Sequence, residues 1–204
     1  MPNKKSLKSA MREPRNIQAV VLGASAGGLY ALKQLLPSLP ANFPCPLMIV
    51  QHMSPHSDNY MVRMLNELSA ITVKEADEKE AILPGTAYVA PPDYHLLVED
   101  DFTLSLSVEE KVNYSRPSID VLFETAADAY GPHLMGIVLT GANADGARGL
   151  AYIKKKGGFA VVQQPEDAES MAMPAAAIEQ AGADLVLPLS GIISFLSEGG
   201  FCGK

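Results

Sequence analysis

Three side chains in this sequence have the types needed for nucleophilic hydrolysis: Ser25, His52 and Asp145. A serine hydroxyl is a weak nucleophile until a base takes its proton, and a carboxylate commonly orients that base. Each of the three comes shortly after an apolar run of strand length, so the expected strands must bring them together. The chemistry to consider is therefore acyl transfer to a serine.

Ser25 lies in the motif Gly-Ala-Ser-Ala-Gly at 23–27, between a predicted strand at 17–22 and a predicted helix at 28–36. A serine on a sharp strand-to-helix turn is exposed at the top of a sheet. The glycines are also compatible with an ordinary β–α turn or with an anion-binding loop. The full dinucleotide-binding pattern is absent because Ser25 occupies its second glycine position, and no P-loop lysine follows. The motif alone leaves these three interpretations open.

The candidate base is His52, which directly follows a strand-like run. Ligands of open α/β sheets bind outside the carboxyl ends of the strands, so we expect Ser25 and His52 at the same edge. His56 follows in an expected surface loop. His95 opens a predicted hairpin and His133 precedes a strand at its amino-terminal end, so both are expected to be structural.

The candidate third residue is Asp145, which ends a strand and glycine-rich loop just before a helix expected from Gly146. Aspartate is also a favoured N-cap residue, so capping explains this position equally well. Asp93 competes for the role from a turn after a strand. Asp120 lies in the expected first turn of another helix, where the dipole favours an acid.

An oxyanion hole requires backbone N–H groups that point toward the reacting carbonyl. The N–H of Ala26 is the first candidate, because the residue after the nucleophile donates in this type of turn. A second donor is expected from the loop at 141–143. Each such donor typically stabilises the transition state by about 3 kcal/mol.

The elements that must position these residues alternate along the chain. Strand-like runs cover 19–22, 47–50, 86–90, 134–139, 160–163 and 185–187, and helix-like runs cover 29–36, 58–68, 118–129, 146–156 and 175–180. Several strand-like runs are continuously apolar, which is typical of a parallel sheet covered on both faces. We therefore predict an α/β fold, a doubly wound and mostly parallel sheet with helices on both faces. Residues 95–98 and 102–108 predict an antiparallel β-hairpin at the edge of that sheet.

Composition limits the class of protein. The 204 residues are 48% hydrophobic, with no apolar run near the ~20 residues of a membrane span and no signal peptide. Cys45 and Cys202 form neither a disulfide framework nor a metal pattern, so we expect a cytoplasmic protein without membrane insertion. We expect a basic, disordered tail at 1–16, a catalytic domain at 17–197 and a loose end at 198–204.

Charge argues against nucleic acid as a partner. The net charge is −7, although five of the 16 basic residues fall within the first fifteen positions. The body of the chain is therefore more acidic than the total indicates, and nucleic-acid-binding domains are typically basic.

Four segments carry a more specific signal: Gly-Ala-Ser-Ala-Gly-Gly at 23–28, Val-Gln-His-Met at 50–53, Ser-Arg-Pro-Ser-Ile-Asp-Val-Leu-Phe at 115–123 and Leu-Thr-Gly-Ala-Asn-Ala-Asp-Gly-Ala at 139–147. Together they resemble the catalytic domain of CheB-type chemotaxis protein-glutamate methylesterases, over about residues 17–197. Met-Ala-Met-Pro-Ala-Ala-Ala-Ile at 171–178 resembles the late helix entry of that family. The chain order serine, histidine, aspartate also differs from that of the α/β-hydrolases.

The resemblance implies an enzyme that hydrolyses glutamate γ-methyl esters on methyl-accepting chemotaxis receptors and can deamidate glutamines. By motif position, Ser25 is the nucleophile, His52 the general base and acid, and Asp145 the residue that orients His52. Ala26 and Ala142 would supply the oxyanion donors. No metal or organic cofactor is implied. The alternative function is a non-catalytic, esterase-like signalling module that binds a receptor or a kinase.

The chain departs from the family at two places. Members usually carry a phosphorylatable receiver domain ahead of the esterase, and here about sixteen residues precede the first strand. We therefore expect no phosphorylation control within this chain, and a signalling kinase or a separate receiver protein are candidate partners. Many members have threonine after the serine and Gly-Met-Gly-Ala-Asp in the aspartate loop, where this chain has Ala26 and Gly-Ala-Asn-Ala-Asp. Backbone donors do not need those side chains, so the departures bear on substrate preference.

Overall fold

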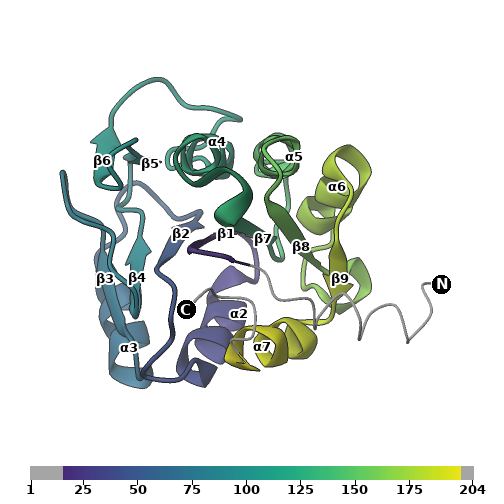
Figure 1. Ribbon diagram of the computed structural model, residues 1–204, viewed down its shortest axis with the longest axis horizontal. Helices are drawn as coiled ribbons and strands as arrows, with labels where there is room; N and C mark the ends of the chain where they lie inside the picture. Colours follow the sequence, from purple (N-terminus) through teal and green to yellow (C-terminus); the bar gives the residue numbers. More distant parts are fainter. Residues whose placement is uncertain (1–15, 199–204) are drawn as a thin grey trace.

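The computed structural model describes residues 16–198, which are built around one parallel sheet (Figure 1). Its strands are β1 (Ala19–Ala24), β2 (Leu47–Gln51), β3 (Thr72–Glu75), β4 (Thr86–Val89), β7 (Leu134–Val138), β8 (Phe159–Gln163) and β9 (Leu185–Leu187). They lie in the order β3-β4-β2-β1-β7-β8-β9, and every neighbouring pair is parallel. The predicted doubly wound α/β sheet is confirmed.

Helices cover both faces of this sheet (Figure 1). They are α2 (Gly28–Leu35), α3 (Tyr60–Leu68), α4 (Ile119–Tyr130), α5 (Ala147–Lys155), α6 (Ala172–Ala181) and α7 (Leu189–Glu198), with short 3₁₀ turns η1 (Leu36–Ser38), η2 (Gly131–His133) and η3 (Pro165–Asp167). Helices α4, α5 and α6 pack on one face, and α2, α3 and α7 pack on the other. No helix of the described residues is long and apolar enough to cross a membrane.

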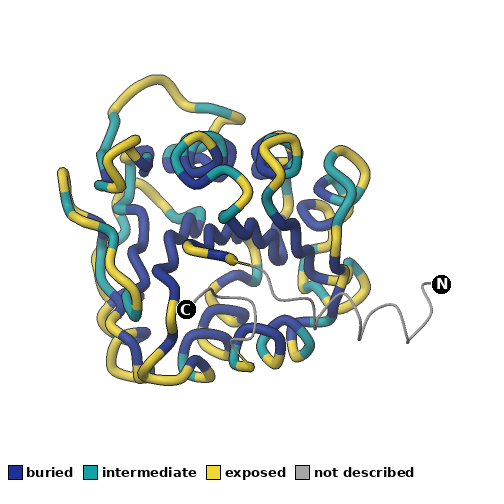
Figure 2. The backbone as a smooth tube through the Cα atoms, in the orientation of Figure 1, coloured by how far each residue is buried: buried dark blue, intermediate teal, exposed yellow. Residues whose placement is uncertain are grey.

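Strand β1 shows why the central strands read as continuous apolar runs. Val20 and Leu22 belong to the apolar core on one face of the sheet, and Ala19 and Val21 belong to the core on the other. Successive side chains of a strand point to opposite faces, so a strand covered on both sides has no polar face. Figure 2 shows the centre of the sheet as continuously buried.

The predicted hairpin is formed by β5 (His95–Val98) and β6 (Leu104–Ser107). It is a separate two-stranded antiparallel sheet that packs against α4. The N–H of Val98 donates to the Thr125 hydroxyl of that helix, 3.2 Å away. The segment that follows the hairpin returns to the start of α4, close to the carboxyl end of the main sheet (Figure 1).

Two elements were not predicted from the sequence, β3 and α7. The edge strand β3 contains two charged residues among its four, so it presents no apolar run. Charges are a common device on edge strands, where they discourage pairing with other chains. The predicted tail at 1–16 and the end at 198–204 lie outside the described residues except for Asn16 and Glu198.

The strand order positions the candidate residues. Strand β1 lies between β2 and β7, with Ala24 opposite Gln51 and Gly23 opposite Val138. The chain segments that follow these three strands therefore leave the sheet side by side at its carboxyl edge. In doubly wound sheets, this point of reversed strand order is where ligands bind.

Candidate active site

Ser25 directly follows β1, on the turn that enters α2. Its N–H donates to the Thr140 carbonyl at 3.0 Å, and its own carbonyl accepts the Gly28 N–H at 2.8 Å. Gly27 has a φ of 78°, and a Cβ there would lie 2.7 Å from the Glu169 side chain. The predicted tight turn is therefore present, and its glycine is required by both conformation and space.

Gln51 links the backbones of two candidate residues. Its side-chain amide nitrogen donates to the carbonyl of Ser25 at 3.0 Å and to that of His52 at 2.9 Å. A Cβ on Gly28 would lie 2.0 Å from the Gln51 amide oxygen, so helix α2 approaches this close only because residue 28 is glycine. Gln51 was not predicted as a site residue from the sequence. The available signal was a polar residue ending an apolar strand.

His52 and Asp145 are brought together as the sequence analysis expected. The Nε2 of His52 lies 2.9 Å from Oδ2 of Asp145, and the side chains are 13% and 0% exposed. A hydrogen bond from Nε2 to a carboxylate leaves the lone pair of neutral histidine on Nδ1. Nδ1 is thus the atom able to accept a proton, and the amide nitrogen of Asn143 lies 3.5 Å from it.

The hydroxyl of Ser25 makes no hydrogen bond to any residue between 16 and 198. The backbones of the two residues are nevertheless linked, because the His52 N–H donates to the carbonyl of Ala24, the residue before Ser25, at 3.0 Å. Catalytic hydrogen bonds between nucleophile and base are often long before substrate binds. The structure therefore places Ser25 and His52 after adjacent strands, and the activating hydrogen bond between them stays a prediction.

The carboxylate of Asp145 is buried among donors. Oδ2 also accepts the Ile119 N–H at 2.7 Å, and Oδ1 accepts the Ser118 hydroxyl at 2.9 Å and the Asn113 amide at 2.8 Å. Burial alone would raise the pKa of Asp145, but the hydrogen bonds from His52, Ile119 and Asn113 outweigh it and lower the pKa. Asp145 is therefore ionised at neutral pH and can stabilise a protonated His52.

Asp145 also caps a helix, but that helix is α4 and not α5, the helix that follows it in the chain. The N-cap of α5 is Gly146, and the Asp145 carboxylate lies at the amino terminus of α4, where it accepts the Ile119 and Asp120 N–H groups. The contact of Asp145 with α5 is with the N–H of the N-cap Gly146, at 3.1 Å, whereas its bonds to first-turn N–H groups are those of α4. Its contacts with His52 and with α4 are made by the same two oxygens.

The two candidate oxyanion donors lie where the sequence analysis placed them, in the turns after β1 and β7. Within residues 16–198 the backbone N–H groups of Ala26 and Ala142 donate to no acceptor. Both residues are exposed. The N–H groups of Ala26 and Ala142 as oxyanion donors stay a prediction.

The other candidate residues have structural partners. Asp93 forms an ion pair with Arg116 at 2.8 Å. His95 is buried and accepts the Ser118 N–H through Nδ1 at 3.1 Å. His133 precedes β7, at the opposite edge of the sheet from the candidate site, and bonds a backbone carbonyl.

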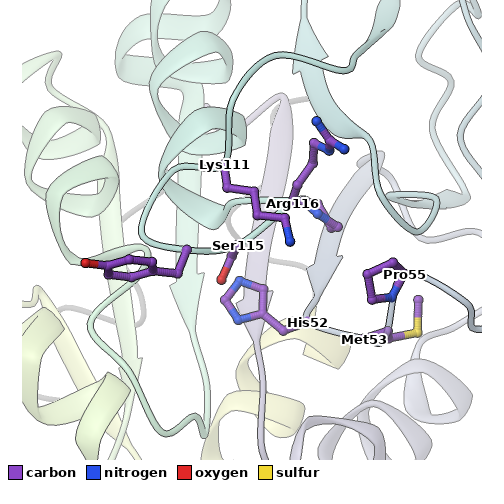
Figure 3. A pocket seen from close by; sticks show the side chains of 8 residues that line it. His52, Met53, Pro55, Lys111, Ser115 and Arg116 are labelled. Carbon is purple, nitrogen blue, oxygen red and sulfur yellow. The ribbon is translucent and has the colours of Figure 1, made fainter.

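Two cavities flank the site. One of about 120 Å³ lies beside His52 and is shown in Figure 3, where Lys111 extends over it toward the imidazole. A second, of about 410 Å³, lies beside Ser25 and is mostly apolar, with Leu29, Tyr30 and Glu169 in its lining. Within residues 16–198 no three His, Cys, Asp or Glu side chains are grouped to hold a metal ion.

Known proteins similar to this chain belong to one family. A model of the CheB methylesterase family matches residues 20–196. A relative from Leptospira interrogans, provisionally named a protein-glutamate methylesterase/protein-glutamine glutaminase, is 55% identical over 87% of this chain and 92% of its own length. A relative of that function from Carboxydothermus hydrogenoformans is 39% identical over 86% of this chain, which spans about half (53%) of the relative.

The fold agrees as well. The crystal structure of the Thermotoga maritima CheB methylesterase catalytic domain superimposes with a TM-score of 0.85 at 35% identity, covering 90% of this chain and 98% of that domain. A family match over nearly all of the described residues and a shared fold at this identity lead to one conclusion. The chain belongs to the CheB methylesterase family.

Proposed function

We propose that this protein hydrolyses glutamate γ-methyl esters on methyl-accepting chemotaxis receptors and deamidates glutamines at the same site. The observation that carries the proposal is the 2.9 Å hydrogen bond between His52 and the buried Asp145, formed beside the serine turn. The names of the relatives supply the substrate class.

In the proposed reaction, Oγ of Ser25 attacks the γ-carbonyl carbon while Nδ1 of His52 accepts the hydroxyl proton. The resulting oxyanion is stabilised by the N–H groups of Ala26 and Ala142. Collapse of this intermediate breaks the bond to the methoxy oxygen, which takes the proton from His52 and leaves as methanol. With a glutamine substrate, ammonia leaves instead.

The second half of the reaction regenerates Ser25. Water attacks the γ-glutamyl ester of Ser25, and His52 accepts a proton from that water. The acyl–oxygen bond to Ser25 then breaks, and His52 returns the proton to the serine oxygen. Because Asp145 stays ionised, it stabilises the protonated His52 in both halves.

The cavity beside Ser25 suits this chemistry. Its lining is mostly apolar, and a neutral methyl ester loses less hydration free energy there than a carboxylate does. The lining also contains Glu169 and Lys33, whose opposite charges offset each other. The apolar lining therefore favours entry of the ester over the carboxylate.

We further propose a cytoplasmic location and a signalling kinase or a separate receiver protein as additional partners. The support for both is the family membership.

The test is methanol release from membranes that carry methylated receptors, with labelling of the protein by a fluorophosphonate. Ser25→Ala should abolish both signals. Ser194→Ala on α7, whose hydroxyl bonds a carbonyl of its own helix, should leave both intact. Full turnover by Ser25→Ala would contradict the mechanism. Receptor binding without any hydrolysis by the wild type would favour the non-catalytic signalling module.

A further inference from the structure

The segment between β6 and α4 carries a tight turn beside the candidate active site. Val112 and Ser115 exchange two backbone hydrogen bonds, of 3.2 and 2.9 Å. Between them Asn113 and Tyr114 have φ values of 52° and 61°, the two positive values that a type I′ turn requires. Asparagine tolerates this conformation, whereas tyrosine rarely adopts it. Other contacts must therefore hold the turn in place.

Arg116 fixes the base of this segment. Its guanidinium donates to the Val108 carbonyl at 2.6 Å, to the Glu109 carbonyl at 2.9 Å and to the Asp93 carboxylate at 2.8 Å. In Figure 3 the backbone of this segment passes over His52. The turn is therefore attached to the body of the protein independently of the catalytic residues.

Asn113 attaches the tip of the turn to two buried carboxylates. Its amide nitrogen lies 2.8 Å from Oδ2 of Asp120 and 2.8 Å from Oδ1 of Asp145. A primary amide has two N–H groups, so each carboxylate receives one of them. Asp120 and Asp145 are 2% and 1% exposed, and hydrogen bonds to ionised acceptors are about twice as strong as neutral ones.

Few charged groups are available to these two carboxylates. His52 faces Asp145 from the end of β2, and Arg148 of α5 lies 3.6 Å from Asp120 with its side chain 54% exposed. The remaining donors are backbone N–H groups and the Ser118 hydroxyl. Among the described residues, Asn113 is the one side chain that bonds both carboxylates.

We propose that Asn113 is a positioning residue, whose amide holds the Asp145 carboxylate in the orientation that bonds His52. The expected effects on kcat and KM rest on the proposed esterase function. The amide also connects Asp145 to the turn that carries Tyr114 and follows Lys111, both of which line the cavity beside His52. A substrate protein that contacts this turn therefore contacts the segment that orients the catalytic carboxylate.

Three variants of the full chain test this role. Asn113→Ala removes both donors, and Asn113→Gly removes them while keeping a residue that favours positive φ. Tyr114→Ala is the matched control, because its side chain is 99% exposed and bonds neither carboxylate. Both Asn113 variants should lower kcat about 10- to 100-fold with little change in KM. Tyr114→Ala should act on KM alone.

The pH dependence gives a second measurement. The Asn113 hydrogen bond lowers the pKa of Asp145, so its loss raises that pKa. The contribution of ionised Asp145 to the free energy of unfolding should then be smaller, and should be lost at a higher pH on acidification, in both Asn113 variants and be unchanged in Tyr114→Ala. In an Asp145→Asn background, Asn113→Gly should cause no further loss of kcat, because the carboxylate that Asn113 orients toward His52 is gone.

A third measurement does not depend on activity. The proton on Nε2 of His52, bonded to Asp145, should give a low-field resonance in the ¹H NMR spectrum. Asn113→Gly should shift or broaden it, and Tyr114→Ala should not. A folded Asn113→Gly with wild-type kcat, pH dependence of unfolding and resonance would overturn the proposal, as would a full additional loss in the Asp145→Asn background. A resonance that responds to Asn113→Gly in a protein without esterase activity would overturn the proposed function alone.

Discussion

Asp120 and Asp145 cap each other's helices. Asp120, in the first turn of α4, accepts the N–H groups of Gly146 and Gly149 at the start of α5, at 3.0 and 2.7 Å. Asp145, which precedes α5, accepts the N–H of Ile119 at 2.7 Å and that of Asp120 at 3.2 Å. Negative charge is stabilised at helix amino termini, so the exchange joins the two helices at the candidate site.

The first prediction concerns Asp145→Asn. An amide has one neutral acceptor oxygen in place of the two charged oxygens that accept from His52 and from the α4 backbone. We therefore expect kcat to fall by about 10³- to 10⁴-fold. Steady-state methanol release measures the effect. Asp128→Asn, which removes a surface carboxylate of α4 that pairs with Lys156, should keep the wild-type rate. A wild-type rate in Asp145→Asn would restrict Asp145 to helix capping.

The second prediction separates stability from catalysis at Asp120. Asp120→Ala leaves the Gly149 N–H without its acceptor, whereas the Gly146 N–H keeps Oδ1 of Asp145 at 3.1 Å. A buried donor without a partner costs about 1–3 kcal/mol. The free energy of unfolding should fall by that amount in urea titrations. Glu124→Ala, one turn further along α4 and partly exposed, is the control and should change it by less than about 0.5 kcal/mol. Equal losses in both variants would contradict the capping role of Asp120.

The third prediction concerns Gln51→Leu. This change removes the donor shared by the Ser25 and His52 carbonyls, so the two backbones lose their direct link. We expect kcat to fall about tenfold or more, since small misplacements of reacting groups are costly. Gln34→Leu on the exposed side of α2 is the matched control. An unchanged kcat in a folded Gln51→Leu would show that strand pairing alone positions the two residues.

The fourth prediction concerns acid stability. The pKa of Asp145 is lowered in the folded protein, because hydrogen bonds from His52, Ile119 and Asn113 outweigh its burial. The ionised group therefore stabilises the fold above its unfolded pKa of about 3.9 and loses that contribution as the pH falls through the folded pKa. The gap in unfolding free energy between wild type and Asp145→Asn should be constant above about pH 5 and shrink toward pH 2. A gap that widens on acidification would contradict the assigned sign.

The fold was largely predictable because its central strands are buried on both faces and its helices end at recognisable turns. The exceptions have physical causes. Strand β3 is a charged edge strand, and the hairpin pairs only with itself because it packs against α4 rather than extending the ladder. Local sequence signals the existence of a hairpin but not which surface it will cover.

The candidate site was predictable only in part. Ser25, His52 and Asp145 each follow an apolar strand. Parallel strands all end at the same edge of the sheet, so the three residues could be predicted to lie near one another. Asn113 had no such signal, because it belongs to a loop and reaches Asp145 only through a turn with two positive φ values. Asp120 was predicted to be an acid favoured by the dipole of its own helix, α4. It also caps α5, and this relationship depends on how the two helices pack.

The position of β1 between β2 and β7 has a kinetic consequence. The hydrogen bond between His52 and Asp145 joins residues 93 positions apart, and it can form only after β7 has paired with β1. Contacts of such long sequence separation form late, because the loop they close must first lose its conformational entropy. During refolding, the helical signal should therefore return before a fluorophosphonate can react with Ser25. The onset of Ser25 labelling then reports when the sheet is complete.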